Sequence, residues 1–405
     1  MTLFYSDPCF QRHQTGEHPE CPIRVAVLEQ HLQRTGLLER VTRCPVTPAA
    51  DADLQLVHST EHLQELRRFA AAGGGRIEAD TVLCPESADV AWLAAGTAID
   101  AVRRVLSGED HTAFCAVRPP GHHALASAPM GFCLLGNAAA AAAAAIHRFG
   151  LSRVLVVDWD VHHGNGTQSI FYEREDVTYG SVHIDPGAGW FPHYMGFADE
   201  VGHGVGTGAN LNVPLPPLST DESWLTAVEQ LAEHALTTGA TALVISLGVD
   251  AAIDDPESPL HITADGYASA GEILGAMNLP TVAVQEGGYH LDTLGPLVAA
   301  TLERADARDV LLVRRDVAQS RRPALRVLTS SPRRAHEIST SASGLYFTKE
   351  LFPKLGIAEQ MNAKTKATGS TGTMVAKGEF EVALQQISEL LPIPGAQTRN
   401  NKVKK

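Results

Sequence analysis

Residues 154–166, with the sequence VLVVDWDVHHGNG, constrain the fold of this chain more than any other segment. Their first half has the length and apolar composition of a buried parallel strand, and the second half changes abruptly to carboxylates, imidazoles and glycines. In open α/β sheets, ligands bind beyond the carboxyl ends of the strands. Asp160 and His162 lie two positions apart, so on extended backbone their side chains point the same way. An oxygen and a nitrogen ligand on one face indicate a catalytic zinc site.

Three more apolar runs end in polar residues in the same manner: 113–117 before His122 and His123, 242–249 before Asp250, and 281–284 before a Gly-Gly turn and Tyr289. Helical patterns lie between such runs, including one over 87–106 and an alanine-rich one over 138–145. This alternation predicts an α/β fold with a parallel sheet and helices on both faces. The four strand ends would then present their polar side chains at one rim.

The charge of the chain divides at about residue 305. Residues 1–305 hold 15 arginines, no lysine and 37 acidic residues, a formal charge of −22. Residues 306–405 hold 17 basic and 9 acidic residues, a charge of +8, and this change in usage indicates a domain boundary. Nucleic-acid binding needs a basic face, so nucleic acid is not expected as a partner of the acidic part. An acidic surface attracts a polyamine or a basic peptide, although serving solubility alone is an equally weighted explanation.

Composition also bears on location. The six cysteines lie in the first third of the chain and show no CxxC pairing, which indicates reduced thiols in a cytoplasmic protein. The first residues lack a basic region followed by an apolar stretch, so no signal peptide is expected. The alanine-rich run is too short to cross a bilayer. We therefore expect a soluble, cytoplasmic protein with no membrane partner.

Six motifs occur in the order found in one enzyme superfamily. They are RPPGHHA at 118–124, GFC at 131–133, DWDVHHGNGTQ at 158–168, FPHYMGFADE at 191–200, SLGVD at 246–250 and EGGY at 286–289. Through these motifs, the chain from about residue 5 to 302 resembles the arginase-like histone deacetylase superfamily. The resemblance is strongest to bacterial acetylpolyamine amidohydrolases and class II-like histone deacetylases. It implies a single deacetylase domain of arginase-like fold over residues 1–305.

The resemblance also implies the metal site and its electrophile. Asp160, His162 and Asp250 would be the three protein ligands of one Zn²⁺ ion per chain, which leaves open positions for catalysis. Tyr289 would donate a hydrogen bond to the oxyanion formed during hydrolysis. The two glycines before it would let the backbone turn tightly and let the tyrosine swing in.

Two histidines would handle protons. The resemblance pairs His122 with Asp158 and His123 with Asn165. A carboxylate partner raises the pKa of a histidine, whereas an amide partner largely does not. We therefore assign His123 as the general base and His122 as electrostatic support.

The resemblance extends to the substrate channel and to a structural ion. Phe132 and Phe191 match two rings that flank a linear acetylated side chain, and Gly131 permits close approach of the backbone. Phe191 lies in the Gly- and Pro-rich segment 185–217, which we interpret as a long functional loop. A structural monovalent cation, K⁺, would be held mainly by backbone carbonyls of Asp158, Asp160, His162, Ser181 and Val182.

The C-terminal hundred residues do not continue the deacetylase pattern. We interpret residues 306–338 as a linker and residues 339–405 as an extension that resembles part of a molybdate-type solute-binding protein. Only about 60 residues match, too few for that two-lobed fold to assemble its ligand cleft, so no transport role is assigned. Whether the extension is ordered stays open at this point.

These observations predict a zinc-dependent amidohydrolase that removes acetyl from acetylated primary amines, with acetylpolyamines as the favoured substrates. One alternative keeps the chemistry and changes the substrate to acetyl-lysine in proteins. Another is a catalytically silent module that only binds acetylated amines, although pure binding has no need of His122, His123 and Tyr289. Polyamine-type relatives often dimerise, so a homodimer is a further expectation.

Overall fold

The structure, a computed structural model, describes residues 2–305 and five strands beyond them. The chain divides into two compact units, Met1–Arg308 and Asp309–Lys405. The strands of the second unit are β11 (Leu312–Arg315), β12 (Leu325–Leu328), β13 (Thr340–Ser341), β14 (Gly344–Thr348) and β15 (Gly372–Val375). β11 pairs antiparallel with β12, and β14 pairs antiparallel with β13 and β15. The predicted linker and the solute-binding-protein resemblance fall mostly on residues outside the described ones.

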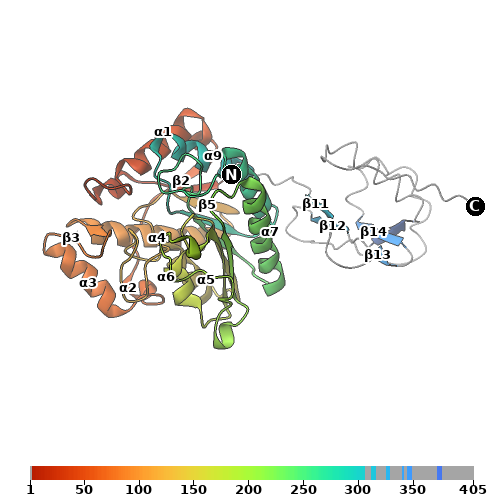
Figure 1. The fold of residues 1–405 in the computed structure, drawn as a ribbon, viewed down its shortest axis with the longest axis horizontal. Helices are drawn as coiled ribbons and strands as arrows, with labels where there is room; N and C mark the ends of the chain where they lie inside the picture. The colour runs from red at the N-terminus through yellow and green to blue at the C-terminus, as the bar shows by residue number, and fades with distance from the viewer. Residues whose placement is uncertain are drawn as a thin grey trace, which may run out of the picture. The chain divides into compact units, whose positions relative to one another are not determined.

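The first unit is built on one eight-stranded sheet in the order β2-β1-β5-β10-β9-β6-β7-β8 (Figure 1). Every pair of neighbours in this sheet is parallel. Its strands are β1 (Thr2–Tyr5), β2 (Val41–Cys44), β5 (Thr112–Cys115), β6 (Val154–Asp158), β7 (Val177–Ile184), β8 (Asn210–Leu215), β9 (Leu243–Leu247) and β10 (Thr281–Gln285). A separate small hairpin pairs β3 (Gly75–Arg76) with β4 (Val82–Leu83).

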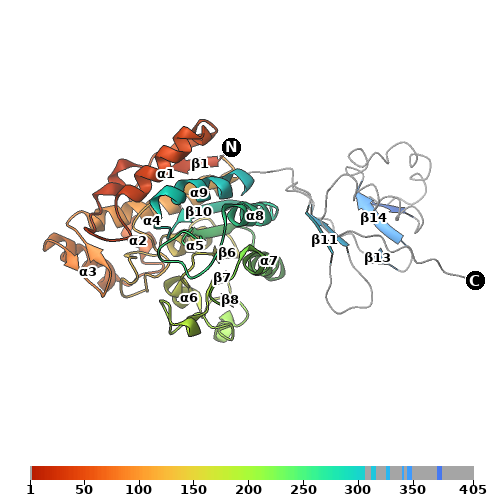
Figure 2. The ribbon, with the colours of Figure 1, turned by 45° about the horizontal axis from the view of Figure 1, so that its top comes forward.

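Helices cover both faces of this sheet (Figure 2). One face packs against α2 (Asp51–Leu54), α3 (Thr60–Ala71), α4 (Ser87–Leu106), α5 (Asn137–His147) and α6 (Asn165–Phe171). The other packs against α1 (Ile23–Arg34), α7 (Asp221–Thr238), α8 (Ala264–Gly275) and α9 (Leu291–Ala305). Short 3₁₀ turns complete the unit: η1 (Pro8–Arg12), η2 (Leu37–Glu39), η3 (Pro186–Ala188) and η4 (Gly204–Gly206). The predicted α/β fold with helices on both faces is confirmed.

Strand side chains alternate between the two cores. In β6, Val154 and Val156 belong to one core, whereas Leu155 and Val157 belong to the other. Because both faces are covered, the central strands β5, β10, β9 and β6 are continuous apolar runs rather than alternating ones. The four predicted strands, β5, β10, β9 and β6, are the adjacent central ones. Their carboxyl ends therefore meet at one edge, as the sequence predicts.

The loop predicted over 185–217 is partly wrong, because residues 210–215 form the edge strand β8. Pro214 has no N–H to donate to a neighbouring strand, so proline in a sequence usually indicates a loop. An edge strand nevertheless tolerates it. The buried side chains of Asn210 and Asn212 are amides that donate to Gln168 Oε1 at 3.1 and 2.9 Å. A strand that buries amides instead of apolar side chains gives no strand-like hydrophobic signal.

A buried ion cluster joins the N-terminal segment to the turn after β5. Arg118 donates to both carboxylate oxygens of Glu20, at 2.7 and 2.8 Å, and Arg24 lies 3.1 Å from the first of them. All three side chains are buried. Burial opposes ionisation of Glu20, but the charges of Arg118 and then Arg24 outweigh it and lower its pKa to about 2. One carboxylate thus balances two guanidinium groups away from water.

Replacing Glu20 with glutamine is expected to lower the free energy of unfolding by about 3–5 kcal/mol at pH 7, because two buried guanidinium groups lose their counter-charge. Urea unfolding followed by tryptophan fluorescence measures this, since all four tryptophans precede residue 225 and report on the first unit alone. The exposed Glu17→Gln is the matched control.

The same pair of proteins tests the sign of the pH dependence. The folded-state pKa of Glu20 lies below its ordinary value of 4.5, so its contribution is present above that value and is lost as pH falls toward 2. The difference in free energy of unfolding between wild type and Glu20→Gln should therefore become smaller as the pH falls. Equal stability at pH 7 would show that the cluster contributes nothing.

Among the described residues, no helix combines the length and apolar character needed to cross a membrane. The six cysteines, all within these residues, form no disulfide.

Candidate active site

Three predicted ligands converge where β6 and β9 end. Asp160 and His162 follow β6 and Asp250 follows β9, and their candidate ligand atoms all lie within 4.8 Å of one another. The His162 Nδ1 atom is 3.2 Å from Asp160 Oδ1 and 3.3 Å from Asp250 Oδ2. All three side chains are buried. Two carboxylates and one imidazole facing a common point form a donor set for one divalent cation.

Backbone groups hold the two carboxylates in place. Val161 N–H donates to Asp250 Oδ1 at 2.8 Å, and Gly287 N–H donates to Asp160 Oδ2 at 2.8 Å. A Cβ atom at position 287 would collide with the carboxylate oxygens of both aspartates. Position 287 is therefore a glycine because the turn after β10 passes directly against the ligands.

The electrostatics of the trio fit a cation. Burial, and then the neighbouring charge of Asp160, raise the pKa of Asp250 to about 8. Two buried carboxylates in contact cannot both ionise cheaply unless a positive charge lies between them. A divalent metal held by both aspartates and by His162 would supply that charge. The residues present therefore fit the predicted metal, and zinc is compatible with these ligand types.

Both predicted histidine pairs are present beside the trio. His122 Nδ1 lies 3.0 Å from Asp158 Oδ2, and His123 Nδ1 lies 2.7 Å from Asn165 Oδ1. The two imidazole centroids are 3.9 Å apart. Burial disfavours the charged form of His122, but Asp160 and Asp158 outweigh it and raise its pKa.

The neighbours of His123 act in the opposite direction. Burial, followed by the charges of His122 and His162, lowers the pKa of His123 well below its ordinary value. The pKa values of the two adjacent imidazoles are therefore shifted in opposite directions, toward the neutral form for His123 and toward the charged form for His122. Such a pair separates a proton acceptor from a fixed positive group.

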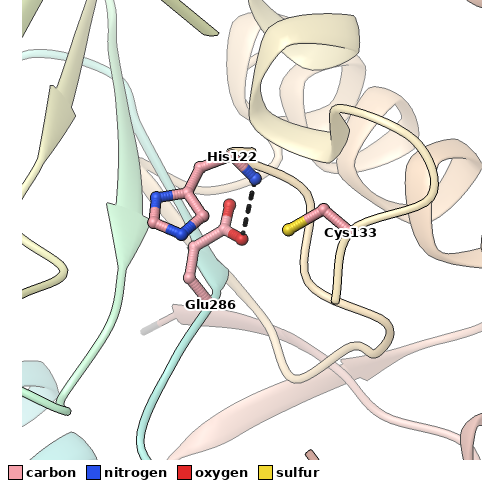
Figure 3. A group of neighbouring side chains, drawn as sticks. All are labelled: His122, Cys133 and Glu286. Carbon is pink, nitrogen blue, oxygen red and sulfur yellow. Dashed lines mark hydrogen bonds between the residues drawn. The ribbon is translucent and has the colours of Figure 1, made fainter. Parts of the chain in front are cut away.

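Glu286, which the sequence did not single out, positions the backbone of this histidine pair. Its Oε2 atom accepts the N–H groups of Gly121 at 2.6 Å and His122 at 3.2 Å, and Ser246 donates to its Oε1 atom. Figure 3 shows the carboxylate beside the His122 backbone, with the Cys133 thiol close by. The ring nitrogens of His122 lie 3.0 Å from Asp158 Oδ2 and 3.8 Å from Asp160 Oδ1, so we assign the metal to the aspartate-histidine trio rather than to His122, Cys133 and Glu286. The available signal was an acidic residue directly after a buried strand.

The turn that carries Tyr289 is tied down on both sides. Arg24 donates to the carbonyls of Glu286 at 2.6 Å and Gly288 at 2.7 Å, and its guanidinium lies 4.9 Å from the centroid of the Tyr289 ring. From the other side, Asp255 Oδ2 accepts the N–H groups of Tyr289 at 2.6 Å and His290 at 3.1 Å. These bonds hold the backbone of the turn, and the swing of the Tyr289 side chain stays a prediction.

The two predicted channel rings contact different residues of the site. Phe191 meets the His123 ring edge-on at 4.9 Å between centroids, and Phe132 meets Tyr289 edge-on at 5.9 Å. Gly131 has a φ of +53°, and a Cβ there would lie 2.6 Å from His123 Cδ2 and 2.9 Å from the Phe191 ring. Gly131 thus permits the close approach that the sequence predicts for it.

Of the residues predicted to hold K⁺, Asp158, Ser181 and Val182 lie on the paired strands β6 and β7, and Asp160 and His162 follow β6. In the β6–β7 register, Asp158 stands opposite Ser181, and Val182 is the next residue. Tyr179 donates to Asp158 Oδ2 at 3.1 Å, and the Ser181 hydroxyl lies 2.7 Å from His183 Nδ1. The β6–β7 pairing therefore places Asp158 beside Ser181, two of the five residues predicted to hold the ion.

Comparisons with known proteins agree with this site. Residues 18–305 match the histone deacetylase domain family. The chain is 39% identical over 280 residues to a histone deacetylase-like amidohydrolase of Pseudomonas aeruginosa, covering 67% of this chain and 72% of that protein. It is 45% identical over 204 residues to an acetylpolyamine amidohydrolase of Burkholderia pseudomallei, covering 50% of this chain and 59% of that protein.

Solved structures give the same result. The crystal structure of acetylpolyamine aminohydrolase from Burkholderia pseudomallei superposes with a TM-score of 0.71 and 31% identity, covering 76% of this chain and 99% of that one. The family match spans most of the first unit, including the metal trio, both histidine pairs and Tyr289. The resemblance found in the sequence is thereby confirmed. This chain belongs to the histone deacetylase family and is a deacetylase of the hydrolase class.

Proposed function

We propose that this enzyme is a zinc-dependent amidohydrolase that hydrolyses acetylated primary amines, with acetylpolyamines as its substrates. The observation that carries the proposal is the convergence of Asp160, His162 and Asp250 beside His123 and the turn of Tyr289. Zinc bound by the trio supplies a Lewis acid that polarises the acetyl carbonyl and acidifies the attacking water.

The protein's own groups account for the rest of the reaction. His123, buried and neutral, takes a proton from the attacking water and returns it to the amine as the C–N bond breaks. The Tyr289 hydroxyl donates a hydrogen bond to the carbonyl oxygen as negative charge develops on it. His122, held by Asp158, adds positive charge near the same oxygen. Phe132 and Phe191 flank the linear chain that carries the acetamide.

Acidic groups near Phe132 support a cationic substrate. The Thr81 hydroxyl accepts the N–H of Phe132 at 3.1 Å and lies 3.2 Å from Glu78 Oε2 and 3.4 Å from Asp80 Oδ1. Two carboxylates are thus linked through one hydroxyl to the backbone of Phe132, a predicted channel residue. With a formal charge of −22 over residues 1–305, the unit also steers polycations toward itself.

Metal removal tests the zinc requirement. Dialysis against dipicolinate is expected to abolish acetate release from N-acetylputrescine, and one equivalent of Zn²⁺ is expected to restore it, because the metal polarises the carbonyl. Metal content by mass spectrometry and tryptophan fluorescence are followed in parallel, so that unfolding is recognised. Full activity in folded protein with no bound metal would overturn the proposal.

Asp255 is expected to position Tyr289. In Asp255→Asn, kcat should fall about ten-fold with stoichiometric zinc retained, because hydrogen bonds to a charged acceptor contribute roughly 1.5–3 kcal/mol. Asp255 uses both carboxylate oxygens, since Oδ1 accepts Glu257 N–H, whereas asparagine has one acceptor oxygen. The exposed neighbour Asp254→Asn is the matched control.

A second background separates positioning from general damage to the fold. In a Tyr289→Phe background, Asp255→Asn should cause no further loss of kcat, since no hydroxyl is left to misplace. Equal losses in both backgrounds would show that Asp255 acts through something other than Tyr289.

Two smaller proposals accompany the main one. A structural K⁺ bound by Asp158, Asp160, His162, Ser181 and Val182 is supported by the β6–β7 register. A cytoplasmic location is supported by the six free cysteines.

A further inference from the structure

Asn165, the partner of His123, is itself held by two residues that the proposed mechanism leaves unused. Its Nδ2 atom lies 3.3 Å from the Tyr194 hydroxyl and 3.4 Å from Met130 Sδ. The Tyr194 hydroxyl in turn lies 3.2 Å from the same sulfur. Asn165 is buried, and its Oδ1 atom lies 2.7 Å from His123 Nδ1. Four side chains from separate segments therefore form one hydrogen-bonded chain that ends at His123.

The direction of each hydrogen bond in this chain follows from the thioether. A methionine sulfur accepts hydrogen bonds and cannot donate them. The Tyr194 hydroxyl, with a single hydrogen, donates it to Met130 Sδ, which leaves its oxygen free to accept from the Asn165 amide. The NH₂ group of Asn165 therefore faces Tyr194 and Met130, and its carbonyl oxygen faces His123.

This orientation decides the tautomer of His123. A carbonyl oxygen cannot donate, so the bond between Asn165 and His123 requires a proton on His123 Nδ1. Nε2 is then the nitrogen with a free lone pair, the form that a general base needs. The opposite orientation of the amide would place N–H groups against Nδ1 and move the imidazole proton to Nε2. Nε2 could not accept a proton in that form, because it would already carry one.

We propose that Tyr194 and Met130 are positioning residues that hold the Asn165 amide in the one orientation that keeps His123 protonated on Nδ1 and competent as a base. The inference rests on the proposed role of His123. We call this restraint by Tyr194 and Met130 the amide lock. An aspartate at position 165 would need no such lock, because a carboxylate has two acceptor oxygens and no wrong orientation. An amide avoids placing a negative charge beside the base, and it therefore has to be oriented by its neighbours.

Tyr194 offers a clean way to test this lock. Its side chain is 50% exposed and lies in the segment between η3 and η4, outside both cores, so loss of its hydroxyl leaves the packing intact. Tyr194→Phe removes the hydroxyl alone. Met130→Leu removes the acceptor-only sulfur and frees the Tyr194 hydroxyl to donate to the amide oxygen, which favours the wrong orientation.

The experiment compares kcat and KM for acetate release from N-acetylputrescine in four full-length, zinc-quantified proteins: wild type, Tyr194→Phe, Asn165→Asp and the double variant. In the native background, Tyr194→Phe is expected to lower kcat roughly five-fold with KM nearly unchanged, as for loss of one hydrogen bond. In the Asn165→Asp background the same change is expected to leave kcat within about two-fold. Met130→Leu should follow the same pattern.

Other outcomes identify what has failed. Wild-type kcat in Tyr194→Phe, or the same loss in both backgrounds, overturns the lock, because orientation matters only for an amide. Tyr172→Phe, which removes a hydroxyl outside the chain of bonds, is the control. His123→Ala is measured alongside, and if it retains activity then the base assignment fails and the lock with it. A wild-type protein that turns over no acetylated amine refutes the proposed function, a result that differs from an active enzyme indifferent to Tyr194.

Discussion

Replacing Tyr289 with phenylalanine is expected to lower kcat for deacetylation by roughly 10²–10³-fold, the usual effect of removing one oxyanion donor. The ring contact with Phe132 and the stacking of Arg24 need only the aromatic ring, so the variant keeps its packing. The turn is fixed by backbone bonds to Arg24 and Asp255, which the substitution leaves intact. Steady-state kinetics of acetate release measure the effect.

Two further measurements, of KM and of zinc content, show whether the loss of kcat is specific to the oxyanion contact. KM should change little, because the hydroxyl acts on charge that develops in the transition state. Zinc content should stay at one per chain, since Tyr289 is not among the metal ligands. A Tyr289→Phe protein with wild-type kcat would remove this residue from the mechanism.

Replacing Asp250 with alanine is expected to weaken zinc binding by more than roughly 100-fold, since loss of even an outer contact costs 10–100-fold, and to abolish activity at limiting metal. Asp250 is one of only three side chains in the candidate donor set. The metal-free variant should still fold, because Asp160 and Asp250 repel each other when no cation lies between them. Metal analysis after dialysis, together with urea unfolding, measures both effects.

The exposed Asp254→Ala, on the same loop, is the matched control and should bind zinc as the wild type does. If Asp250→Ala retained stoichiometric zinc through dialysis, Asp250 would not be a ligand.

The central sheet was predictable because its strands are buried on both faces. Such strands are continuous apolar runs, and the polar residues that follow them are visible in the sequence, as after Val157 and Leu247. The edge strand β8 was not predictable, because it contains Pro214 and buries Asn210 and Asn212. Apolar patterning finds strands in the middle of this sheet and misses the strand at its edge.

The same distinction applies to the site. The ligand trio and the histidine pairs stand next to predicted strands, so their positions followed from the sequence once the family motifs were identified. The positions of residues that support them from a distance could not be predicted from the sequence. Arg24 reaches the turn of Tyr289 from a helix more than 260 residues earlier in the chain, and its neighbouring sequence gives no sign of that contact.

Asp255 and Tyr194 show a second limit. The role proposed for each depends on hydrogen bonds to groups whose position is set by how the loops cross after the strands end. Aspartate and tyrosine in Gly- and Pro-rich segments are common without any such role. Their contribution therefore emerged only from three-dimensional contacts.

Acetate release by the full-length, zinc-quantified protein is the decisive measurement, with N-acetylputrescine and an acetyl-lysine peptide compared side by side. We expect hydrolysis of both with a clearly higher kcat/KM for N-acetylputrescine, because carboxylates lie near Phe132 and residues 1–305 carry a formal charge of −22. A preference for the peptide would contradict the polyamine assignment. Silence on both substrates with zinc bound would contradict the proposed function itself.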